Sequence, residues 1–481
     1  MRITVFADKR NGSFTDPTAW QNTTLRYAPP RNFPAYLAEN IGRAKIMRVF
    51  ITLDEYWEIF DDTYYPDYEI GKARVPVSER HFAYDWGDVV PAPAGTSFED
   101  YLQLHAENAD ELLLNVRRLE REVSDGIITY EKYTEVFSRS VEYCKKLAPN
   151  IRYIECCNEV DLEYFGNLTA DEYVKIYLCA HAAIKELNKK HNYEIPLEIG
   201  GYAAAFPINR WDMFSDVMRL LKKTDIGDCP MDFYSYHHYE AANMPALLKD
   251  GCFDIAETSD IDKLKLILRN HNKLAEELKL PRKPVFLDEL GRAASTGIKA
   301  NCLYNAAGLL TYLIAFESNE FENMYPFPWC TFHNPSQQIS YTQFILNDDG
   351  SYSATPNGIA LIMLHRMRGY MLSINIENAF GRDVKYRAMA VRNSEMISVI
   401  CVNPTSDITP CRLSVNNLPD GNYTIDCYQC SENGNNCVTS NGSGKLEITK
   451  TISAASIKGV LAAVFPLGRD NFILCEIRRN H

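Results

Sequence analysis

Long apolar runs, an excess of positive charge and glycine-rich motifs are missing from the 481-residue sequence, and each absence excludes a broad class of protein. No apolar run approaches the ~20 residues needed to cross a bilayer, so no membrane span is expected. The net charge of −13 opposes non-specific binding to nucleic acid and to anionic membranes, and neither partner is predicted. No glycine-rich fingerprint or Walker motif is present to support an open, nucleotide-binding sheet.

The sequence also lacks the marks of export and of a disulfide framework. Residues 1–8 are too few and too soon charged for a signal peptide, so a cytoplasmic protein is expected if the chain is complete. A secreted or periplasmic protein is expected if a signal peptide was removed. Fourteen cysteines do not form a disulfide framework in a chain of this length. Cys427 and Cys430 have only Cys437 nearby and no His at finger spacing, so no metal site is predicted.

Short apolar segments alternate with amphipathic ones over most of the chain. This alternation produces βα units around a parallel sheet. About eight units fit before residue 370, which favours a closed (β/α)₈ TIM barrel. Strands are expected near residues 45–51, 112–116, 151–157, 197–201, 231–239, 284–289 and 325–332, and helices near 34–41, 98–108, 130–147, 169–190, 211–221, 261–278 and 301–317.

From about residue 380 short alternating strands and hairpin turns replace the helices, which is typical of a β-sandwich. The length also favours two domains, one of them large. We therefore predict an α/β protein with a catalytic barrel over residues 11–375 and a C-terminal β-sandwich over residues 376–481. The N-terminal strand, within residues 1–10, is expected to join the sandwich.

Two carboxylates follow predicted barrel strands. Glu159 comes after the strand at 151–157, and Glu289 closes the strand at 284–289. The carboxyl ends of barrel strands meet at one face, where the active sites of such barrels lie. Taken alone, either residue could simply end a strand. Together they match glycoside hydrolysis, which uses one carboxyl group as a proton donor and a second as a nucleophile or base.

A long segment at residues 54–97 follows the second predicted barrel strand and is rich in Tyr and Trp. Long loops in compact domains are usually functional or disordered, and this aromatic content argues against disorder. Sugars stack on such side chains. We predict that the segment folds over the carboxyl-end face and forms one wall of a sugar site.

The motifs resemble those of clan A glycoside hydrolases, most closely family 39, which contains β-xylosidases and α-L-iduronidases. That family has Glu-Val-Trp-Asn-Glu-Pro-Asn-Leu at the end of strand four, where this chain has Glu155-Cys-Cys-Asn-Glu-Val-Asp-Leu162. Its Asp-Phe-Val-Ser-x-His-x-Tyr on strand six is similar to residues 232–239. Its Thr-Glu on strand seven is similar to Asp288-Glu289. Cys157 replaces the family Trp, Val160 replaces Pro, and Phe50 replaces a frequent substrate-contacting His.

The resemblance implies a role for each matched residue. Glu159 is the acid/base and Glu289 the nucleophile. The remaining matched residues are expected to bind substrate or support the nucleophile: Asn158 at the sugar 2-hydroxyl, His237 and Tyr239 in the active site, Trp329 as a sugar platform, and Arg48 keeping the nucleophile ionised.

Each supporting residue has a plainer interpretation. His237 and His238 could bind metal, although no second His cluster supports this. Trp329 could be core, and Arg48 could form a structural ion pair. Adjacent residues on a strand face opposite ways, so only one of Asp288 and Glu289 is expected to point at substrate.

The sequence therefore predicts a retaining glycoside hydrolase that acts by double displacement without a metal or cofactor. The expected substrate is a plant or microbial polysaccharide or oligosaccharide, β-xyloside-like in character. The alternative is a catalytically silent carbohydrate-binding barrel.

Overall fold

A computed structural model describes residues 1–23, 31–53, 98–162, 165–224, 226–227, 229–239, 260–292, 303–331, 342–347, 349–379, 381, 383–404, 409–432, 434–435 and 444–480. The predicted segment at residues 54–97 lies outside the described residues. No helix in the described ranges combines the length and apolar character that a membrane crossing requires.

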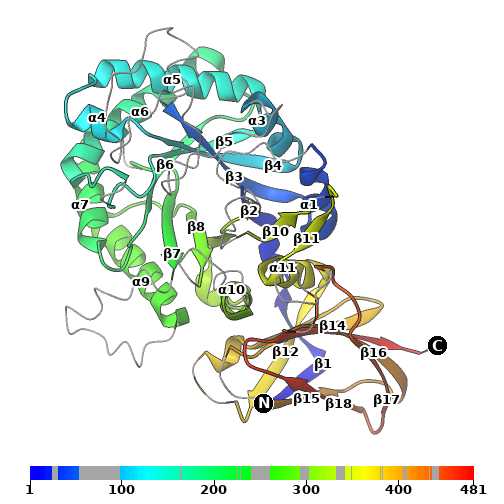
Figure 1. The fold of residues 1–481 in the computed structure, drawn as a ribbon. Coiled ribbons are helices and arrows are strands. Elements are labelled where there is room, and N and C mark those ends of the chain that lie inside the picture. Colours follow the sequence, from blue (N-terminus) through cyan, green and yellow to red (C-terminus); the bar gives the residue numbers. More distant parts are fainter. Residues whose placement is uncertain are drawn as a thin grey trace.

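A parallel barrel forms the larger part of the molecule (Figure 1). Its strands hydrogen-bond in chain order, and Thr331 N donates to Asn22 O at 2.9 Å where the last strand meets the first. The predicted (β/α)₈ barrel is confirmed. The strands are β2 (Trp20–Asn22), β3 (Ala44–Thr52), β4 (Ala109–Arg117), β5 (Ile151–Cys156), β6 (Glu198–Ala204), β7 (Tyr234–Tyr239), β8 (Val285–Gly291) and β9 (Met324–Pro328).

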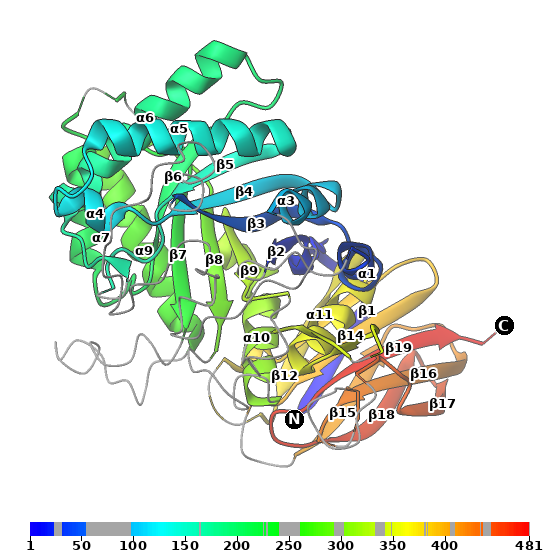
Figure 2. The same cartoon turned by 45° about the horizontal axis from the view of Figure 1, so that its top comes forward.

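Helices pack around this sheet (Figures 1 and 2). Several of them, such as the helix at residues 130–147, bury one apolar face. A capping box begins α6, with Thr169 N donating to Glu172 at 2.7 Å. The helices are α1 (Phe33–Ile41), α3 (Phe98–Glu107), α4 (Glu120–Ser124), α5 (Tyr130–Leu147), α6 (Ala170–His191), α7 (Trp211–Leu221), α9 (Asp260–Leu278), α10 (Leu303–Phe316) and α11 (Pro356–Arg366), with short 3₁₀ turns at Pro17–Ala19, Asn319–Phe321 and Val384–Tyr386.

The C-terminal part folds into a mostly antiparallel nine-stranded sheet around its own apolar core, so the predicted β-sandwich is also confirmed. The N-terminal strand β1 (Arg2–Ser13) lies in this sheet, antiparallel to β12 and parallel to β15. The other strands are β12 (Tyr370–Glu377), β13 (Ala388–Arg392), β14 (Met396–Val402), β15 (Thr409–Asn416), β16 (Gly421–Cys430), β17 (Lys450–Ser456), β18 (Val460–Leu467) and β19 (Phe472–Arg479), while β10 (Phe344–Leu346) and β11 (Tyr352–Ala354) form a separate hairpin. Strand β12 spans the predicted domain boundary at residue 375, which stays a prediction.

The barrel strands carry two successive layers of side chains. The first is an apolar cluster of Trp20, Ile46, Leu113, Tyr153, Phe233, Phe286 and Phe327. Alternate residues of a strand share a face, so the residues two positions further along point the same way. They are Asn22, Arg48, Asn115, Glu155, Ser235, Asp288 and Trp329, all buried. The first six form the polar layer, which lies directly beneath the carboxyl-end face of the barrel.

Candidate active site

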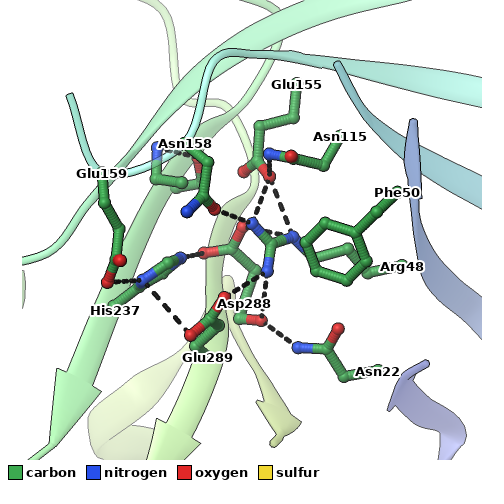
Figure 3. A network of polar contacts seen from close by, with 12 residues as sticks. Asn22, Arg48, Phe50, Asn115, Glu155, Asn158, Glu159, His237, Asp288 and Glu289 are labelled. Atoms are coloured by element: carbon green, nitrogen blue, oxygen red, sulfur yellow. Dashed lines mark hydrogen bonds and ion pairs between the residues drawn. The ribbon is translucent and has the colours of Figure 1, made fainter. Parts of the chain in front are cut away.

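The guanidinium of Arg48 is the centre of the polar layer (Figure 3). It is fully buried, and Nη1 donates to Oε1 of Glu289 at 2.9 Å. Nε donates to Oε2 of Glu155 at 2.9 Å, and Nη2 donates to Oδ1 of Asn158 at 2.8 Å. Burial would lower the pKa of Arg48, but its attraction to the neighbouring carboxyl groups, those of Asp288, Glu155 and Glu289, outweighs burial and raises the pKa above its ordinary value.

The backbone after β5 turns sharply to present Glu159. Cys157 has φ 70° and Glu159 has φ 51°, both in the left-handed region that residues other than glycine adopt infrequently. Hydrogen bonds to the neighbouring strands hold this turn, since Cys157 N donates to Val116 O at 2.8 Å and Glu159 N donates to Ala203 O at 3.1 Å. Backbone strain of this kind is found at functional sites, where surrounding contacts hold it in place.

His237 lies between the two carboxyl groups predicted to act in catalysis (Figure 3). Its Nδ1 is 2.7 Å from Oε1 of Glu159 and 3.5 Å from Oε2 of Glu289. Burial lowers the pKa of His237 to about 4, against the attraction of Glu289, so the ring is neutral near neutral pH. One oxygen of Glu159 and one of Glu289 lie within 4.8 Å of each other.

Tyr239 and Trp329 occupy different parts of the site. The Tyr239 hydroxyl donates to Oε2 of Glu289 at 2.9 Å, so each oxygen of Glu289 receives a hydrogen bond. The Trp329 ring is only 6% exposed and packs edge-on against Phe50 with centroids 5.7 Å apart. Its predicted role as a sugar platform stays a prediction.

Strand β8 places two consecutive carboxyl groups against Arg48. The pairing of β8 with β7 shifts register after Leu287, so that Glu289, not Asp288, is the partner of His237. Asp288 is therefore an extra residue in the strand, as in a β-bulge. Its Oδ2 lies 3.1 Å from Arg48 Nε. Both side chains thus reach the site, with Asp288 in the polar layer and Glu289 nearer the carboxyl-end face of the barrel.

The sequence did not predict four residues of the polar layer as site residues: Asn22, Asn115, Glu155 and Ser235. Asn115 donates to Oε2 of Glu155 at 2.7 Å, and Asn22 donates to the backbone carbonyl of Asp288. Burial opposes ionisation of Glu155, but the charge of Arg48 and the hydrogen bonds around it lower the pKa to about 2. Strand alternation is the signal that could have found these residues, since each stands two positions after an apolar-layer residue.

Glu159, His237 and Glu289 are close enough together to be considered as metal ligands. The cationic guanidinium of Arg48 already contacts Glu289 at 2.9 Å, and Tyr239 donates to its other oxygen. A second cation at Glu289 would be repelled by Arg48 and would displace the tyrosine hydrogen bond. The arrangement therefore suits proton transfer and nucleophilic attack better than metal binding.

No protein-family model and no curated sequence matches the chain, but solved structures do. The GH39 enzyme of Xanthomonas axonopodis pv. citri is similar over 100% of this chain and 97% of its own, with TM-score 0.64 and 12% sequence identity. A monomeric beta-xylosidase of Caulobacter crescentus CB15 gives TM-score 0.64 and 12% identity over the full length of both chains. A glucosidase of Croceicoccus marinus gives TM-score 0.61 and 15% identity over 100% and 99%. The chain therefore has the fold of family 39 glycoside hydrolases.

Proposed function

We propose that this protein is a retaining glycoside hydrolase in which Glu289 is the nucleophile and Glu159 the acid/base. The observation that carries the proposal is the approach of these two carboxyl groups to within 4.8 Å at the ends of β5 and β8, with His237 between them. Retaining enzymes place the two groups roughly 5–5.5 Å apart, whereas inverting enzymes separate them by roughly 6.5–9.5 Å to admit a water. One oxygen of each group lies within 4.8 Å of the other, which is below the inverting range and supports the retaining arrangement.

In the first step the Glu289 carboxylate attacks the anomeric carbon while Glu159 transfers its proton to the glycosidic oxygen. Arg48 and Tyr239 donate hydrogen bonds to the two oxygens of Glu289 and hold its carboxyl group in place for attack. The negative charge of Glu289 in turn favours the protonated form of Glu159. The leaving group departs as an alcohol, and a glycosyl ester forms on Glu289.

In the second step the Glu159 carboxylate takes a proton from water, which attacks the same carbon and releases the sugar with retained configuration. The charge on Glu289 is absent in the ester, so proton loss from Glu159 no longer places two anions side by side. The neutral His237 ring, 2.7 Å from Glu159, supplies an N–H that can donate to the newly formed carboxylate. Asn158, held through its Oδ1 by Arg48, leaves its amide N–H₂ for the sugar 2-hydroxyl.

The proposed substrate is a β-xyloside-like poly- or oligosaccharide, as in the β-xylosidase whose fold the chain shares. A panel of aryl β-xylosides, β-galactosides, β-glucosides, α-arabinosides and α-iduronides tests this proposal. Chromophore release from one of them, with initial product of the same anomeric configuration by NMR, supports a retaining glycosidase. An inverted product contradicts the mechanism, and binding of sugars without release from any glycoside supports the silent carbohydrate-binding alternative.

A further inference from the structure

The carboxyl group of Asp288 is buried without a hydrogen-bond donor. Arg48 lies close, but its hydrogen bonds go to Glu155, Glu289, Asn158 and the Asp288 backbone carbonyl, and none reaches the Asp288 side chain. Within the described part of the chain, neither oxygen of this carboxyl group accepts a hydrogen bond. A fully buried carboxylate that receives no hydrogen bond is costly, because burial removes its hydration and only the charge of Arg48, 3.1 Å from Oδ2, offsets that loss.

Apart from Arg48, the groups that face the Asp288 carboxyl group present acceptor atoms to it. Glu155 lies within hydrogen-bonding reach, and its Oε1 also accepts no aligned hydrogen bond. On the opposite side, His237 Nε2 lies 3.7 Å from Oδ1. Nδ1 of the same ring faces the carboxyl groups of Glu159 and Glu289, and we assign the proton of the neutral ring to this atom, which leaves Nε2 a lone pair. The Asp288 carboxyl group can therefore form a hydrogen bond with Glu155 or with His237 only by donating a proton.

The charge balance supports the same conclusion. The charged and titratable groups that face Asp288 are Arg48 from β3, Glu155 from β5, His237 from β7 and Glu289 from β8. His237 is neutral, so Arg48 is the single cation shown among three carboxyl groups. Three carboxylates around one guanidinium leave two uncompensated negative charges in a buried site.

We propose that Asp288 is a neutral carboxylic acid whose proton is donated to Glu155, so that the charge of Arg48 is shared between Glu155 and Glu289 alone. Asp288 is then a positioning residue, acting through Arg48 on the proposed nucleophile. An ionised Asp288 would place a second negative charge beside Glu289 and compete for the same guanidinium.

The pKa values expected for the pair agree with this assignment. Burial raises the pKa of Asp288 well above its usual range, against the attraction of Arg48, and the negative charge of Glu155 raises it further. The pKa of Glu155 is instead lowered to about 2. The two carboxyl groups thus share one proton, and it resides on Asp288.

Infrared spectroscopy tests the proton itself, and it needs no catalytic activity. At pH 8 the difference spectrum between the unaltered chain and Asp288→Asn should show loss of the carbonyl stretch of a protonated carboxyl group. The control Asp426→Asn removes a carboxyl group that pairs with Arg478 at 2.7 Å, and it should show loss of carboxylate bands instead. Loss of carboxylate bands in Asp288→Asn would overturn the proposal.

Two further samples keep this test decisive if Asp288→Asn does not fold. Asp288→Thr places a hydroxyl donor beside Glu155 and should lose the same protonated-carboxyl band. The unaltered chain labelled with carbon-13 at its aspartate carboxyl groups should show a shifted protonated-carboxyl band at pH 8. Absence of that band in the labelled chain would overturn the proposal without any variant.

The kinetic consequence rests on the proposed glycosidase function and is measured separately. In Asp288→Asn the amide still donates to Glu155 and carries no charge, so kcat/KM should stay within about tenfold of the unaltered chain, the cost of one altered neutral hydrogen bond. The acidic limb of the pH profile of kcat/KM should not move in this variant. Glu155→Gln removes a true anion beside Arg48 and should shift that limb to lower pH. An equal shift in Asp288→Asn would show that Asp288 is ionised. A chain with the infrared band but no hydrolysis would refute the glycosidase function alone.

Discussion

The Nδ1 atom of His237 lies 2.7 Å from Oε1 of Glu159 and only 3.5 Å from Oε2 of Glu289. One fully buried ring therefore contacts both carboxyl groups of the proposed reaction. Its single N–H can serve whichever carboxyl group is charged, Glu289 before the first step and Glu159 after it.

His237→Phe should keep the ring volume and remove these contacts. We expect kcat to fall about 10²-fold for a glycoside with a poor leaving group, because Glu159 loses the contact that holds it in place. The loss should be smaller for an activated aryl glycoside, which depends less on proton donation. The control His271→Phe alters a buried ring that contacts Tyr236, and its leaving-group dependence should match the unaltered chain. Equal losses for both glycosides in His237→Phe would contradict this role.

The protonation of His237 is a separate prediction. Burial lowers its pKa to about 4, whereas an unfolded chain has a value near 6.5. The folded state binds this proton less readily than the unfolded chain, so the ring contributes a loss of stability as the pH falls from about 6.5 towards 4. Nitrogen NMR should show a neutral His237 ring at pH 6, and an imidazolium ring at that pH would contradict the assignment.

Arg48→Met should be severely destabilising. The variant leaves Glu155 and Glu289 buried without their cation, and breaking buried pairs of this kind costs about 3–5 kcal/mol. Urea unfolding measures the change in the free energy of unfolding. The control Arg282→Met breaks an exposed pair with Glu322 at 3.3 Å and should cost about 0–1 kcal/mol. Similar losses in the two variants would show that the buried network does not depend on the Arg48 charge.

The buried carboxyl group of Glu317, outside the active site, should make the stability of the protein depend on pH. Burial raises its pKa to about 7, although Thr15 donates to it from its backbone N at 2.9 Å and its hydroxyl at 2.6 Å. The folded state thus binds this proton more tightly than the unfolded chain, in which the pKa of a glutamate is near 4.3. The stabilising contribution is full below about pH 4.3 and is lost as the pH rises through about 7.

Glu317→Gln should remove that contribution. The stability of the variant relative to the unaltered chain should rise between pH 5 and pH 8, as measured by urea unfolding at each pH. A constant difference across this range would contradict the raised pKa.

The sequence predicted the barrel, the sandwich and most helices because their hydrophobic patterns are regular. It did not predict the first barrel strand, β2, which has only three residues and carries Gln21 and Asn22 instead of an apolar run. Its place in the barrel is determined by pairing with β3, a contact that sequence pattern does not encode.

In the site, the end-of-strand positions of Glu159 and Glu289 were visible in the sequence, but the buried network beneath them was not. Alternation was applied to the adjacent pair Asp288 and Glu289, but not to residues two positions apart along β5 and β8. Tyr153 and Phe286 lie in the apolar layer, so Glu155 and Asp288, two residues later, also face inward. The register shift that brings Glu289 to His237 beside an inward-facing Asp288 depends on the neighbouring strands.

Azide rescue of the two carboxyl variants tests the assigned roles most directly. With an activated aryl glycoside, Glu159→Ala should still complete the first step and accumulate the glycosyl ester, because its general base is missing. Azide needs no base and should release a glycosyl azide of retained configuration. In Glu289→Ala turnover should collapse, since the nucleophile is indispensable to the covalent route, and azide should attack from the vacated face to give the inverted product. Inverted product from Glu159→Ala with retained product from Glu289→Ala would exchange the two roles and contradict the account.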